Sequence, residues 1–103
     1  MLEIICDFCS SPVVAWRYPA ETFSIDIVTS YEDWAACDLC HALIEAGDSD
    51  GLLNRSVAMF PGLADVPADA REGIMARLHA MITPLHNGFH ASRQGPAAPH
   101  LGR

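Results

Sequence analysis

Two segments near the N-terminus have the hydrophobic pattern of β-strands. Residues 23–28 alternate between apolar and polar side chains, and residues 13–18 are rich in β-branched and aromatic side chains. The four residues 19–22 between them fit a loop. We therefore predict a hairpin with three cross-strand pairs: Tyr18 with Phe23, Trp16 with Ile25, and Val14 with Ile27. In this register Arg17 lies diagonal to Asp26, within reach of a salt bridge.

The next two segments have the pattern of helices. Residues 38–46 are good helix formers and precede Gly47, a natural C-terminal cap, although the capping-box pattern of residues 30–33 gives an alternative start near residue 31. A second helix is predicted from Asp48 or Ser49 to Phe60, where Pro61-Gly62 ends it.

A third, longer helix is predicted to open at residues 65–67, with Pro67 near its start. Its apolar residues recur at helical spacing: Ile74, Leu78, Met81, Ile82 and Leu85. Pro84 is expected to kink or end this helix. From residue 91 the chain has little to bury, so residues 91–103 are expected to form a disordered tail.

Several large side chains are predicted to fill the core rather than to form a binding surface. They are the aromatic residues Trp16, Tyr18 and Trp34, and the methionines Met59, Met75 and Met81.

Four cysteines form two C-x-x-C pairs, Cys6 with Cys9 and Cys37 with Cys40. This spacing aims both sulfurs of a pair at one point, and two such pairs close a tetrahedron around a metal ion. We expect one structural Zn²⁺ per chain, because four thiolates leave no position for water or substrate. His41 follows Cys40 and could replace one cysteine, but a role beside the metal is favoured.

Two other interpretations of the cysteines stay open. A rubredoxin-like iron site is disfavoured because Ser10 and His41 stand where such sites usually carry Gly with a positive φ. Redox-active dithiols or disulfides are disfavoured because the N-terminus has no secretory signal, which predicts a reducing, cytoplasmic location.

The order of a cysteine pair, a hairpin and a helix with the second pair resembles treble-clef and zinc-ribbon domains. The chain also resembles small bacterial proteins with the layout C-x-x-C, W-x-Y-P, W-x-x-C-x-x-C and L-I-x-x-G-D, here at residues 6–9, 16–19, 34–40 and 43–48. The resemblance implies a fold and a metal but no activity. We expect an α+β fold in one zinc-binding domain, residues 1–90: a treble-clef-like part (1–47) and a helical extension (48–90).

The charge of the chain bears on its partners. Six basic and thirteen acidic residues give a net charge of −7, which disfavours binding to nucleic acid or to anionic membranes. An acidic stretch suggests a contact face for an unknown, basic protein partner, with six candidates: Glu32, Asp33, Asp38, Glu45, Asp48 and Asp50. A nucleic-acid-binding finger that uses Arg17 and Arg55 is the alternative.

Three histidines share one stripe of the third helix. His86 and His90 have the i, i+4 spacing of helical metal ligands, so they are candidates for a second metal site. His79 lies on the same side of the helix, seven residues before His86. The favoured interpretation is that these histidines are polar residues at the boundary of the core. No catalytic motif is evident, so we expect a protein–protein interaction or regulatory module rather than an enzyme; a thiol-based redox or metal sensor is a further alternative.

Overall fold

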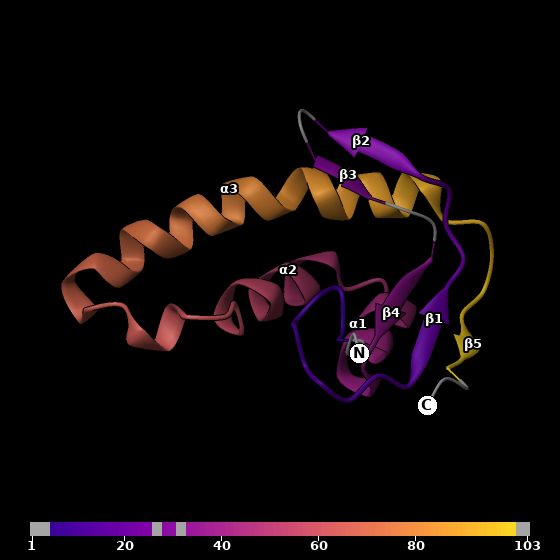
Figure 1. Cartoon of the computed structure of the whole chain (residues 1–103), viewed down its shortest axis with the longest axis horizontal. Helices are drawn as coiled ribbons and strands as arrows, with labels where there is room; N and C mark the ends of the chain where they lie inside the picture. The colour runs from indigo at the N-terminus through magenta and orange to yellow at the C-terminus, as the bar shows by residue number, and fades with distance from the viewer. Residues whose placement is uncertain (1–4, 26–27, 31–32, 101–103) are drawn as a thin grey trace.

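The strands gather at one end of the molecule, and α2 and α3 extend away from them (Figure 1). This computed structural model describes residues 5–25, 28–30 and 33–100. The strands are β1 (Trp16–Tyr18), β2 (Phe23–Ile25), β3 (Val28–Ser30), β4 (Trp34–Ala36) and β5 (Ala98–Pro99). The helices are α1 (Asp38–Glu45), α2 (Ser49–Ala58) and α3 (Ala68–Ser92), with a 3-10 turn η1 (Leu63–Asp65) between α2 and α3. The predicted α+β class is confirmed.

The strand pairing differs from the predicted hairpin. β1 lies between β4 and β5, antiparallel to both, and β2 pairs with β3 in a separate two-stranded sheet. Tyr18 is therefore opposite Trp34 rather than Phe23, and Trp16 is opposite Ala36 rather than Ile25. Only two residues separate β2 from β3 in sequence, whereas four separate β1 from β2, and two residues is the commonest length of a hairpin connection. Ile27, the expected partner of Val14, lies outside the described residues.

The ion pair of Arg17 changes with the strand pairing. Arg17 lies 3.4 Å from Asp33, the residue just before β4, because β4 is the neighbour of β1. The expected partner Asp26 lies outside the part of the chain that the structure describes. Both side chains of the observed pair are largely exposed, so the pair adds little stability.

The helices follow the hydrophobic pattern. α1 ends before Gly47, whose φ of 70° is the left-handed conformation of a helix cap. The alternative start near residue 31 is wrong, because residues 34–36 form β4. Asp48 caps α2, with its carboxylate accepting a hydrogen bond from the Gly51 N–H at 2.9 Å.

α3 continues through Pro84 to Ser92. Its last third packs into the core, with His86 and Phe89 buried, and this packing offsets the hydrogen bond that Pro84 cannot make. Gly88 permits a close contact in this region, since a Cβ there would collide with the ring of Phe23 in β2.

The expectation of a disordered tail from residue 91 is corrected over residues 91–100. The chain turns back after α3, and β5 pairs with β1 (Figure 1). Backbone hydrogen bonds join Gln94 N–H to Pro19 O at 2.7 Å and His100 N–H to Ala15 O at 2.8 Å. The segment buries little of its own surface, and its order comes from the free edge of β1.

Two apolar clusters form the core. The first surrounds the cysteines and contains Phe8, Tyr18, Trp34 and Phe89; the second lies between α2 and α3. Tyr18 and Trp34 are core residues, as predicted, and Trp16 packs at the edge of the first cluster. The prediction for the methionines was wrong for two of three, since Met59 and Met81 are about half exposed. No helix in the described ranges is both long and apolar enough to cross a membrane.

Candidate metal centre

The first cysteine pair lies in the loop before β1. This loop is closed by two backbone hydrogen bonds, from Cys6 N–H to Ser11 O at 2.8 Å and from Ser10 N–H to Cys6 O at 2.9 Å. Ser10 has a φ of 66°, the left-handed conformation that such turns usually assign to Gly. The absence of Gly at this position therefore does not count against a rubredoxin-like turn in the first pair.

The second pair lies at the N-terminus of α1. Cys37 is the N-cap residue, and Cys40 stands in the first turn, so both sulfurs face the same side of the helix start. The sulfur of Cys37 accepts the Cys40 N–H at 3.5 Å. The positive end of the helix dipole also lies here, which favours negative charge on the sulfurs.

The fold brings all four cysteines together. Their sulfurs lie within 4.8 Å of one another, and the Cys9 and Cys37 sulfurs are 3.6 Å apart. Zn–S bonds of ~2.3 Å in a tetrahedron place sulfurs ~3.8 Å apart, so the cluster fits one tetrahedral metal ion. Each cysteine is at most 5% exposed and none is in a disulfide. The four-sulfur donor set suits zinc or iron.

The thiols of this cluster influence one another's ionisation. A hydrogen bond from the Cys40 thiol stabilises the Cys6 thiolate and lowers the pKa of Cys6 to about 4, against the effect of burial. The same hydrogen bond raises the pKa of Cys40, and burial raises the pKa of Cys9. Without a cation, the buried thiolates repel one another, so the cluster needs a bound positive charge to ionise fully.

Arg55 of α2 supplies a positive charge beside the cysteines. Burial of the guanidinium works to lower the pKa of Arg55, but the nearby sulfurs of Cys40, Cys37 and Cys9 outweigh it and raise this pKa. In the alternative function as a nucleic-acid-binding finger, Arg55 was expected to contact nucleic acid, whereas in the structure it lies near the sulfurs of the cysteine cluster. The sequence gives one clue: no basic residue stands between Tyr18 and Arg55.

The two aspartates inside the cysteine pairs hold the site together, a role that the sequence analysis missed. Asp7 is joined to Ala35 of β4 twice, through its N–H at 2.8 Å and through its carboxylate, which accepts the Ala35 N–H at 2.7 Å. Burial nevertheless raises the pKa of Asp7. Asp38 accepts the indole N–H of Trp16 at 2.9 Å. Each aspartate thus fastens one cysteine pair to the neighbouring strand.

His41 lies beside the cluster and is not one of its ligands. Its ring stacks on Trp16 at 3.9 Å, and its Nδ1 is 2.8 Å from the Tyr18 hydroxyl. That hydroxyl donates to Glu45 at 2.8 Å, so Nδ1–H of His41 is the donor to Tyr18. Burial and the bond to Glu45 raise the pKa of Tyr18, and the same bond lowers the pKa of Glu45.

The predicted acidic face is only partly free. Asp33 pairs with Arg17, Asp38 with Trp16, Glu45 with Tyr18 and Arg93, and Asp48 caps α2. These four residues and Asp50 are all exposed, whereas Glu32 lies outside the described residues. The negative charge faces solvent, but most of the carboxylates already make contacts within the chain.

The structure does not assemble a metal site around the histidines. Within residues 5–25, 28–30 and 33–100, the four cysteines are the only group of three or more metal-ligating side chains close enough to share an ion. His86 is buried, with its Nε2 3.3 Å from the Ser56 hydroxyl, and His90 is exposed beside Phe89. His79 is also exposed.

Comparison of the chain with protein-family models, curated proteins and solved structures found no match.

Proposed function

We propose that this chain is a small zinc-binding protein whose four-cysteine site is structural, and that it acts as a protein–protein interaction or regulatory module. The observation that carries the proposal is the burial of four sulfurs within 4.8 Å of one another. A metal bound there would be closed to water and substrate, as in structural zinc sites. Zinc is favoured over iron because it is the usual metal of two C-x-x-C pairs of which one precedes a short sheet and the other lies at the start of a helix.

A metal at this point would join the elements of the domain. Cys6 and Cys9 come from the loop before β1, and Cys37 and Cys40 come from the junction of β4 and α1. Structural zinc contributes on the order of 10 kcal/mol in small domains, which is as large as the net stability of a domain of this size. The metal therefore has the role of a cross-link between distant segments.

The metal is tested by native mass spectrometry and elemental analysis of the purified chain. We expect one zinc per chain and four thiols protected from alkylation. One iron per chain would indicate electron transfer instead. No metal, with four reactive thiols or with disulfides, would contradict the proposal.

The interaction role rests on the exposed acidic residues of segment 33–50. A basic partner would be attracted by these charges and would bind more weakly as salt rises. Charge reversal at Asp50 in the zinc-loaded chain should weaken binding to such a partner, because Asp50 is exposed in the first turn of α2. Reversal at Asp69, in the first turn of α3, is the matched control. Equal binding by both variants would exclude this face.

A further inference from the structure

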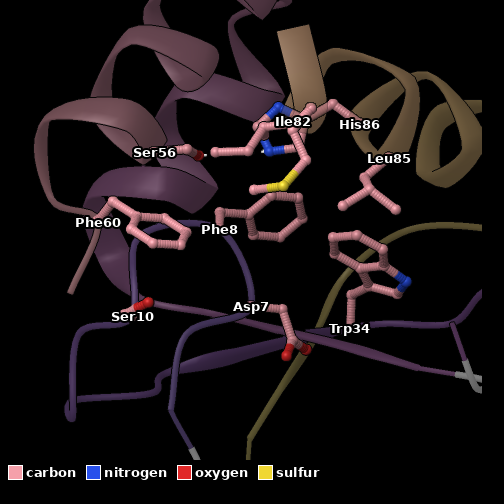
Figure 2. Close-up of a pocket in the computed structure, with 10 residues that line it drawn as sticks. Asp7, Phe8, Ser10, Trp34, Ser56, Phe60, Ile82, Leu85 and His86 are labelled. Atoms are coloured by element: carbon pink, nitrogen blue, oxygen red, sulfur yellow. Dashed lines mark hydrogen bonds between the residues drawn. The ribbon is translucent and has the colours of Figure 1, made fainter. Parts of the chain in front are cut away.

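A small cavity lies between α2, α3 and the loop of the first cysteine pair, with a volume of about 150 Å³. Its walls are mainly apolar and come from three aromatic and three aliphatic or thioether side chains: Phe8, Trp34, Phe60, Met81, Ile82 and Leu85. In Figure 2 the ring of Phe8 lies between Phe60 on one side and Trp34 with Leu85 on the other. The cavity is separate from the cysteine cluster, although Phe8 stands between Cys6 and Cys9 in sequence.

Two polar side chains, Ser56 and His86, line one wall of the cavity. The Ser56 hydroxyl donates to the Leu52 carbonyl at 3.0 Å, so the 3.3 Å contact with His86 is donated by Nε2–H of His86 (Figure 2). Ser56 Oγ retains one acceptor site, and Nδ1 of His86 is a buried acceptor with no partner among the described residues. His86 is only 6% exposed. Such unfilled acceptors favour a ligand that brings an O–H or N–H donor.

The charges around the cavity exclude anions. Asp7 lies on the side opposite Ser56 and His86 (Figure 2), and no Arg among the described residues lines the cavity. Burial lowers the pKa of His86 to about 4, so its ring is neutral at physiological pH. A carboxylate or phosphate would find no cation here and would meet the charge of Asp7.

The opening of the cavity is apolar. Phe60 is 37% exposed and Met81 is 52% exposed, and both line the cavity. Methionine adapts its shape to a bound molecule at little cost. An apolar cavity of ~150 Å³ is large enough for one benzene ring.

We propose that this cavity binds a neutral, single-ring aromatic molecule that carries one hydrogen-bond donor, of the phenol class, with its ring against Phe8 and its donor toward Ser56 and His86. Binding would remove water from the ring of the ligand and from the ring of Phe8. The ligand would also donate a hydrogen bond to the unfilled acceptors of Ser56 and His86. This inference goes beyond the interaction role and does not depend on it.

The test is titration of the ¹⁵N-labelled, metal-loaded full chain with phenol, benzene and benzoate, followed by NMR. We expect saturable shifts centred on Phe8, Ser56 and Ile82, with phenol binding about fivefold more tightly than benzene and benzoate not binding. Met81→Trp should fill the opening and weaken phenol binding at least about tenfold. Val13→Trp is the matched control, since Val13 is 67% exposed and does not line the cavity.

Ser56→Ala tests the hydrogen bond. If the variant folds, it should reduce the preference for phenol over benzene to about twofold or less; the Met81→Trp comparison does not depend on that folding. Non-saturable shifts, or binding that Met81→Trp leaves unchanged, would overturn the proposal. The proposal would also be overturned if the cavity bound none of the three ring compounds but bound the aromatic side chain of a peptide, because the occupant would then be a protein partner.

Discussion

Arg55 and Cys40 come from adjacent helices and meet at the cysteine cluster, where the sulfur of Cys40 is the largest influence that raises the pKa of Arg55. α2 thus contributes to a site whose sulfurs come entirely from residues 6–40. A four-thiolate zinc site carries a net charge of −2, and a buried guanidinium offsets part of it. The helical extension is therefore connected with the metal site electrostatically as well as by packing.

Replacement of Arg55 by Met should weaken zinc binding about 10- to 100-fold, the range found for residues that support the ligands of a metal site. Competition with a chromophoric chelator measures the affinity. Arg17→Met is the control, because Arg17 is exposed and its ion pair is with Asp33, at 3.4 Å, away from the cysteines. If the two variants hold zinc equally well, Arg55 has no part in the site.

Zinc binding should release protons and weaken in acid. Cys9 and Cys40 have raised pKa values and are protonated in the metal-free chain at neutral pH, so binding must displace at least these two protons. Calorimetry in buffers of different ionisation enthalpy counts them. Zinc affinity should fall as pH falls, because protons then compete for the thiolates; an affinity independent of pH between 6 and 8 would be inconsistent with four thiolate ligands.

Replacement of one cysteine ligand should destabilise the whole domain, although the substitution changes only one side-chain atom. Cys37→Ser removes one of the four metal ligands while Ser can still cap α1, so we expect loss of the cooperative unfolding transition in circular dichroism because the metal is no longer held. Treatment of the unmodified chain with a strong chelator should have the same effect. A metal-free chain with undiminished stability would show that the site does not stabilise the fold.

His86 should make the fold sensitive to acid. Burial lowers its pKa to about 4, below the ~6.5 of an exposed histidine, so the unfolded chain binds the proton more readily. The contribution of His86 to the free energy of unfolding is fully present above pH ~6.5 and is lost as pH falls toward 4, a change on the order of 2–3 kcal/mol. Denaturant unfolding of the chain and of His86→Gln, compared pH by pH, cancels the contribution of the cysteines. Parallel curves for the two proteins would exclude His86 as the cause.

The cap of α2 can be tested at one side chain. Asp48→Ala should cost about 1 kcal/mol, because the Gly51 N–H loses its partner while the rest of the fold is unaffected. Asp48→Asn retains an acceptor oxygen and should cost much less. Urea denaturation measures both, and an equal loss in the two variants would assign the effect to charge rather than to capping.

The C-terminal segment should stabilise the sheet. Deletion of residues 94–103 removes β5 and the hydrogen bonds from Gln94 and His100 to the chain near β1, each worth about 1 kcal/mol net. Arg93 remains in that variant, and with it the 4.6 Å contact over the Tyr18 ring. Deletion of residues 101–103 alone is the control. Faster hydrogen exchange at Arg17 in the longer deletion only would confirm the pairing.

The features that the sequence determined are local ones. Helical spacing, the cap at Asp48 and the glycine after α1 depend on residues within a few positions of one another, and all three helices follow from them. The C-x-x-C spacing is equally local, and it indicates a metal before any fold is known. The meeting of the two pairs was inferred from chemistry, since one tetrahedral ion requires four ligands.

Tertiary structure decided the relationships between distant residues. The strand next to β1 depends on which pairing best covers Tyr18 and Trp34, and the alternating pattern of residues 23–28 is satisfied equally well by β3. Likewise, Arg55 is a surface charge in the sequence and a partner of buried sulfurs in the fold, because α1 and α2 pack side by side. A local pattern fixes which face of an element is apolar, but it does not specify the partner that covers that face.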